Sequence, residues 1–107
     1  MFKYFLSGSY TVEGTKGLIK DGGTGRKTAV EKMAASLDGA LESFHFSAGA
    51  PSYYAVMSVP NKLAAAAIGA TVVASGGVTI SECVEVLTPA EMDEAVKKSP
   101  AYRAPGR

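Results

Sequence analysis

The chain has 107 residues, of which 47% are hydrophobic, 20% charged and 8% aromatic, and its formal net charge is +1. This length and composition predict one globular domain and exclude a disordered or collagen-like chain, while the balanced charge disfavours nucleic-acid binding. One histidine and one cysteine exclude an internal disulfide and a Cys/His metal cluster within a single chain, so we expect no metal and no cofactor.

The first elements in chain order are a strand and an interrupted helix. Lys3–Tyr10 is rich in aromatic and hydroxyl residues, a composition typical of a strand. A helix capped by Thr11 is expected to run to Lys20, where the glycine-rich stretch Asp21–Gly25 interrupts it. Apolar residues at helical spacing then predict a second helical piece from Arg26 to Asp38, with Gly39 as its left-handed terminator.

A hairpin of two strands is expected next. Leu41–Ala48 and Tyr53–Val59 flank a Gly-Ala-Pro-Ser turn. Strict alternation places Phe44 and Phe46 on one face of the first strand, and Leu41, Ser43 and His45 on the other.

The second half predicts a helix, a strand and a short final helix. Asn61 is a suitable cap for an alanine-rich helix from Lys62 to Ser75. The strand Val78–Leu87 follows; its alternation predicts one apolar face made of Val78, Ile80, Val84 and Val86. Thr88, Pro89 and Glu91 form a capping-box pattern for a helix that ends near Lys98.

This order of elements predicts an α+β fold of the ferredoxin-like βαββαβ type, with a four-stranded antiparallel sheet and both main helices on one face. We expect residues 1–99 to form the domain and residues 100–107 to form a C-terminal tail, which is either disordered or an arm lying on a partner. The strands are apolar on both faces, so a second copy is expected to cover the open face. The expected partner is therefore another copy of the chain, in a homodimer or higher homo-oligomer.

Nothing in the sequence indicates a membrane or an export pathway. The longest apolar run, Leu63–Ala74, is shorter than the ~20 residues that a spanning helix needs. The N-terminus lacks the pattern of a signal peptide, and Cys83 has no partner. The expected location is the cytoplasm. Carboxylates beside Cys83 should raise the pKa of its thiol and make it unreactive.

The chain resembles the GYD-domain proteins, a bacterial family of small ferredoxin-like proteins. The resemblance rests on KYFLSGSYTVEGTKGLIKDGGTGRKTAVEK, on SLDGALESFHFSAG and on LTPAEMDEAVKKSPAYRAPG, and it covers nearly the whole chain. It implies a place in the wider dimeric α/β-barrel group, which contains enzymes and regulatory modules alike. The Gly-x-Tyr-Asp signature is only partly retained, because Gly49 is followed by Ala50, Pro51 and Ser52.

One candidate binding segment is Gly23, Thr24, Gly25, Arg26 and Lys27. Glycine amides, a helix N-terminus and two cations suit an anion. The segment is not a P-loop, since Arg26 separates Gly25 from Lys27 and no strand precedes it. The alternative is a glycine kink between two helical pieces, with solvated basic residues.

His45 and three tyrosines are the other candidates. His45 is a potential general base, and Tyr10, Tyr53 and Tyr54 cluster at strand ends, where their hydroxyls could orient a ligand. All four are candidate ligand-binding residues; the alternative is ordinary packing. The favoured function is binding of a small ligand or partner in a cavity between sheet and helices. The alternative is a cofactor-independent monooxygenase- or isomerase-like enzyme that uses His45 and a tyrosine.

Overall fold

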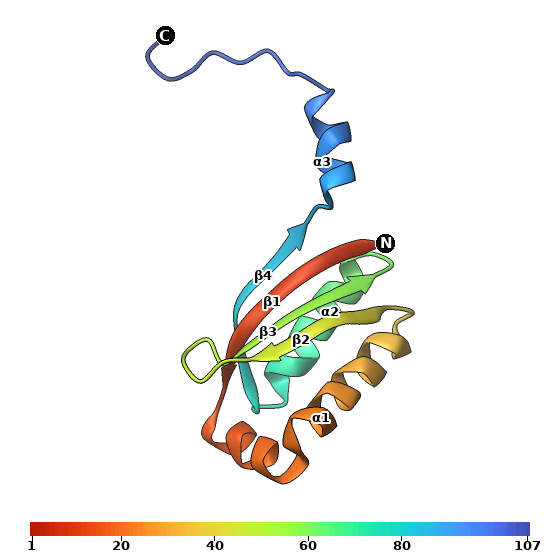
Figure 1. The fold of residues 1–107 in the computed structure, drawn as a ribbon, viewed down its shortest axis with the longest axis vertical. Helices are drawn as coiled ribbons and strands as arrows, with labels where there is room; N and C mark the ends of the chain where they lie inside the picture. The colour runs from red at the N-terminus through yellow and green to blue at the C-terminus, as the bar shows by residue number, and fades with distance from the viewer.

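A computed structural model describes all residues from Met1 to Arg107. Its elements are β1 (Phe2–Tyr10), α1 (Val12–Ser36), β2 (Ala40–Phe46), β3 (Tyr53–Val59), α2 (Lys62–Ala74), β4 (Val78–Val86) and α3 (Pro89–Val96). The four strands form one antiparallel sheet in the order β2-β3-β1-β4, and α1 and α2 cover the same face of it (Figure 1). The ferredoxin-like α+β fold is thus confirmed.

Helix α1 passes through the predicted interruption. Gly14 donates its backbone N–H to the Thr11 hydroxyl at 3.1 Å, which confirms Thr11 as the N-cap. Gly22 alone has a non-helical backbone, with φ of 75° and ψ of 166°, and it produces the bend in α1 (Figure 1). The prediction of a gap over Asp21–Gly25 is therefore wrong in extent, because one glycine in a left-handed conformation suffices for the kink.

The end of α1 also differs from the prediction. The left-handed residue is Asp38, with φ of 61°, and not Gly39; aspartate is one of the few residues with a side chain that tolerate this conformation. Gly39 is required for a different reason. A Cβ atom there would lie 2.5 Å from the Ser58 carbonyl oxygen, so the chain can enter β2 this close to β3 only with glycine.

A bulge at Glu42 changes the faces of β2. Leu41 pairs with Met57, but Ser43 already pairs with Val56, so Leu41 lies on the helix-covered face with Phe44. The prediction that Leu41 shares a face with Ser43 and His45 is therefore wrong, because an extra residue shifts the two-residue alternation.

A second irregularity, in β4, also changes which side chains lie on each face of the sheet. Opposite Ser7 and Gly8 of β1, the pairing skips from Glu82 to Ile80. Val78 and Ile80 therefore face the helices, whereas Val84 and Val86 lie on the open face of the sheet, opposite Phe5 and Lys3. The predicted single apolar face of β4 is wrong, and both faces of the sheet receive valines from it.

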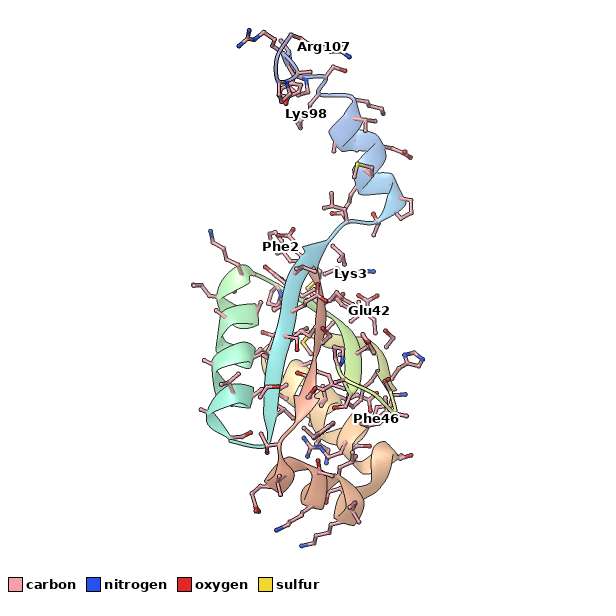
Figure 2. All side chains as sticks on the ribbon, turned by 90° about the vertical axis from the view of Figure 1, so that its left-hand side faces the viewer. Phe2, Lys3, Glu42, Phe46, Lys98 and Arg107 are labelled. Carbon is pink, nitrogen blue, oxygen red and sulfur yellow. The ribbon has the colours of Figure 1, made fainter.

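The core between sheet and helices is small, and much apolar surface remains exposed. It consists of Leu6, Met57, Val59, Ala64 and Ile68. The capping residues Asn61 and Thr88 are confirmed for α2 and α3, but no residue of α3 is buried. Helix α3 and the tail from Lys98 to Arg107 project away from the sheet (Figures 1 and 2), and the radius of gyration is 16.8 Å, against about 13 Å for a compact chain of this length.

Candidate functional site

An apolar cavity of about 110 Å³ lies between the helices and the covered face of the sheet. Thirteen residues line it, and all of them except Arg26 are hydrophobic. Leu6 and Met57 form the floor, from the central strands β1 and β3, while Val30 of α1 and Ile68 of α2 contribute to the helical walls. The space therefore lies inside the fold's own hydrophobic layer.

Tyr10, Phe44 and Tyr53 form an aromatic wall of this cavity, and the Phe46 ring packs behind it without lining the cavity. Phe44 and Tyr53 lie with ring centroids 6.4 Å apart, Tyr10 and Tyr53 are 5.8 Å apart in an edge-on arrangement, and Tyr10 and Phe46 are 6.2 Å apart and nearly stacked. The Tyr53 hydroxyl donates to the Thr79 carbonyl at 2.9 Å. That hydrogen bond fixes the Tyr53 ring and ties β3 to β4 across β1.

A glycine makes room for the Tyr53 ring. A Cβ atom on Gly8 would lie 1.8 Å from the Thr79 carbonyl oxygen and 2.6 Å from the Tyr53 hydroxyl oxygen. Both distances are far below contact, so any side chain at position 8 would displace the hydrogen bond that orients Tyr53.

The kink in α1 positions both an aromatic ring and the single charge of the site. A Cβ atom on Gly23 would lie 3.2 Å from the Phe46 ring, so the glycine allows this ring to pack directly beneath the helix. Figure 2 shows Phe46 near the kinked part of α1. One turn later, Arg26 lines the apolar cavity, whereas its neighbour Lys27 is exposed and does not line it.

Arg26 stands where the apolar cavity meets a second cavity. This second space, of about 250 Å³, shares Arg26, Tyr10 and three apolar residues with the first, and its remaining lining consists of glycine and hydroxyl residues near the ends of α1, α2 and β4. Arg26 has one ion-pair partner, the Asp21 carboxylate at 3.5 Å, which is longer than the ~2.7–2.9 Å of a tight charged hydrogen bond. The guanidinium is therefore not saturated by its own chain.

The two tyrosine hydroxyls of the cavity lining remain neutral in this environment. Burial raises the pKa of Tyr10, and the neighbouring Arg26 guanidinium offsets only part of that rise. Burial is also the main cause of the raised pKa of Tyr53, with a further contribution from Tyr10. Both phenols can thus serve as hydrogen-bonding groups at neutral pH and not as anions.

The predicted ligand-binding residues divide between the two faces of the sheet. Tyr10 and Tyr53 line the cavity. His45 pairs with Tyr54 in the β2–β3 ladder, on the open face, and His45 is exposed. Successive strand residues point to opposite faces of the sheet. Tyr53 and Tyr54 are adjacent, so Tyr53 lies on the covered face with Tyr10, and Tyr54 lies on the open face with His45.

The predicted anion-binding segment is a continuous turn of helix and not a glycine loop. The Thr28 hydroxyl donates to the Thr24 carbonyl at 3.1 Å, as in a regular helix. Of the five predicted residues, only Arg26 lines either cavity. Arg26 was predicted as an anion-binding residue because it follows the glycines in the sequence. The sequence did not predict that aromatic side chains would lie beside it.

The turn with the incomplete signature is anchored by Ser52. Its backbone N–H donates to the Gly8 carbonyl at 2.7 Å, and its hydroxyl accepts the Tyr10 N–H at 3.1 Å. The residue in the position of the signature aspartate therefore holds the end of β1, and with it the Tyr10 side chain at the cavity.

The open face carries a polar network at one end and apolar side chains at its centre. Lys3 donates to Glu42 at 2.9 Å, and the Ser58 hydroxyl also donates to Glu42; Figure 2 shows Lys3 and Glu42 side by side. These hydrogen bonds, first that from Ser58 and then that from Lys3, lower the pKa of Glu42. Phe5 and Tyr54 lie at the centre of this face with ring centroids 6.0 Å apart.

The fold and cavity together define a small ferredoxin-like α+β protein with a largely apolar site under its helices. None of its helices has the length and apolar character needed to cross a membrane. The family model of the GYD domain matches residues 4–96, and the chain belongs to this family. No curated protein and no solved structure matches the chain.

Proposed function

We propose that this protein is a small homo-oligomeric binding protein that holds a small ligand in the cavity between its sheet and helices. The observation that supports this function is the cavity itself, whose lining is hydrophobic except for Arg26. Protein interiors are close-packed, and an unfilled apolar space costs stability. An apolar pocket with few polar groups is also the usual form of a small-molecule site.

Native mass spectrometry of freshly purified protein tests the binding function. We expect an adduct of a small molecule that is released on denaturation. Ala29 is exposed and lines the cavity, so Ala29→Phe should block the site and remove the adduct. Ala35 is exposed on the same helix and lines neither cavity; Ala35→Phe should retain it. Absence of any adduct from the unmodified protein would contradict the proposal.

The proposed oligomer is a homodimer, or a higher homo-oligomer, formed through the open face of the sheet. A folded monomer of 11.0 kDa is expected to expose about 5,600 Å², whereas this chain exposes 7154 Å². The excess of about 1,500 Å² per chain is in the range that obligate homodimers bury. Phe5, Tyr54, Val56 and Val84 supply apolar surface at the centre of that face.

Helix α3 supports the same assembly. Its capping box is complete, yet Met92 is 50% and Val96 63% exposed. A short helix gains most of its stability from packing an apolar side. We propose that the segment from Leu87 to the C-terminus lies as an arm on the second copy.

Light scattering coupled to gel filtration tests the oligomer. We expect at least twice the chain mass at micromolar concentration, and dissociation in Val84→Glu. Val73 lies on α2 and is 51% exposed, against 43% for Val84, so Val73→Glu is a matched control that should leave the assembly intact. A single-chain mass for the unmodified protein, or equal dissociation of both variants, would refute the interface.

The enzyme alternative is less well supported by the geometry. It requires His45 and a tyrosine in one pocket, but His45 lies on the face opposite Tyr10 and Tyr53 and lines neither cavity. Tyr54 is the tyrosine on its face. A site built on His45 would therefore be a different one, on the surface that we assign to the second copy.

We further propose a cytoplasmic location. Cys83 is a free and exposed cysteine, and unpaired thiols persist in reducing compartments. Immunoblotting of fractionated cells tests this, and recovery in an exported fraction would contradict it.

A further inference from the structure

We infer that the ligand of this cavity is a small monocarboxylic acid, whose apolar body occupies the cavity and whose carboxylate binds Arg26. This inference rests on the proposed binding function and adds the chemical class of the ligand. It depends on three observations: the single charge of the lining, the position of that charge, and the size of the apolar space.

The positive charge of Arg26 favours a ligand with a single negative charge. Arg26 is the only charged residue lining either cavity, and its side chain is 33% exposed. Asp21 pairs with Arg26 only loosely, at 3.5 Å, so the planar fork of this half-buried guanidinium can still take the two oxygens of a carboxylate. A dianion such as phosphate fits less well, because the Asp21 carboxylate lies 3.5 Å from the guanidinium and would repel the second charge.

The position of Arg26 orients the ligand. It lies with Tyr10 at the junction of the hydrophobic cavity and the more polar second cavity. An acid bound there would place its carboxylate at the junction, within reach of the Arg26 guanidinium and the Tyr10 hydroxyl. Its apolar body would extend toward Ile68 and Met57, away from water.

The volume limits the apolar body. An apolar cavity of about 150 Å³ binds benzene, and the apolar space here is about 110 Å³ and adjoins a second one. The body should therefore be no larger than about one six-carbon ring. Benzoate is a suitable probe, benzamide is its uncharged counterpart of the same shape, and acetate is the anion without the body.

Calorimetric and NMR titrations of the full chain at millimolar probe concentrations test this inference. We expect benzoate to bind at least about 10-fold more tightly than either benzamide or acetate, since a charged hydrogen bond adds about that much discrimination. Amide shifts should occur at Tyr53, Ile68 and Val72, which line the cavity. This comparison uses only the unmodified protein.

A pair of variants then tests the role of Arg26. Arg26→Gln should abolish the preference for benzoate over benzamide. Lys27→Gln removes the same charge from the adjacent position, which lines neither cavity, and should preserve the preference. Equal binding of benzoate and benzamide to the unmodified protein would overturn the carboxylate assignment, as would equal losses in the two variants. Failure of both benzoate and benzamide to shift the cavity amides would count against the binding function itself.

Discussion

The close contact between the start of α1 and the start of β4 leads to a quantitative prediction. A Cβ atom on Gly14 would lie 1.7 Å from the Gly77 carbonyl oxygen, whereas one on Gly17 would meet no atom within 4 Å. Both glycines lie in the first turns of α1 and line the second cavity. Gly14→Ala should therefore destabilise the protein, and Gly17→Ala is its matched control.

The magnitude follows from the hydrogen bonds at this contact. To accommodate alanine, the two segments must separate by more than about 1 Å. This would break the bond from the Thr11 N–H to the Gly77 carbonyl, at 3.0 Å, and that from the Thr11 hydroxyl to the Gly76 carbonyl, at 2.7 Å. Each is worth about 1 kcal/mol. Alanine gains up to about 1 kcal/mol over glycine in a helix, but both variants share this gain, so the difference between them should be about 2 kcal/mol.

Urea unfolding followed by circular dichroism measures this difference. Both variants are compared at one protomer concentration, because assembly contributes to stability. With a typical denaturant dependence of about 1–3 kcal/mol per M urea, the midpoint of Gly14→Ala should lie roughly 1 M below that of Gly17→Ala. Equal midpoints, or a higher midpoint for Gly14→Ala, would refute the close approach of α1 and β4.

Three further predictions concern the core, the thiol and the open face. Ile68 is 2% exposed and Ile19 is 80% exposed; Ile68→Ala should cost about 2–4 kcal/mol of unfolding free energy and Ile19→Ala less than about 0.5 kcal/mol, and similar costs would contradict the packing of α2. Cys83 is exposed as a residue, but partial burial of its thiol, and not the neighbouring carboxylates, raises the pKa, so a disulfide reagent at pH 8 should modify it more slowly than free cysteine and at the normal rate in urea; equal rates in both conditions would argue against that partial burial. The lowered folded-state pKa of Glu42 means that its contribution to stability is present above the pKa of the unfolded chain and is lost as pH falls through the folded pKa. Glu42→Gln should therefore flatten the acid side of the stability–pH curve, and an unchanged curve would exclude this contribution.

The elements and their order were predictable because the signals are local. The caps Thr11, Asn61 and Thr88 each bond a backbone N–H three residues ahead, so the start of each helix is encoded within one turn. The strand β3 was predicted with its exact bounds, and its alternation is regular, with Tyr53, Ala55, Met57 and Val59 buried. Such features depend on no distant part of the chain.

It was not possible to predict from local sequence which side chains of β2 and β4 lie on each face of the sheet. The bulges at Glu42 and Ser81 exist because of how each strand pairs with its neighbour, and a bulge is a property of two strands and not of one. They move Leu41 to the covered face and Val84 to the open one. The position of Arg26 at the cavity likewise depends on the direction of the kink at Gly22, which composition does not specify.

The order of strands in the sheet has a consequence for how the chain folds. The first strand, β1, lies between β3 and β4, so its second neighbour is the last strand to be synthesised; Ser9 and Thr79, which are hydrogen-bonded, are separated by 70 residues. Pairings of such long range are slow to form because the chain must first close a large loop. We expect the nascent chain to keep an unpaired edge of β1 until β4 is complete. The segment after Val86 is not needed to close the sheet, so any contact that it makes with another copy can follow folding of the domain.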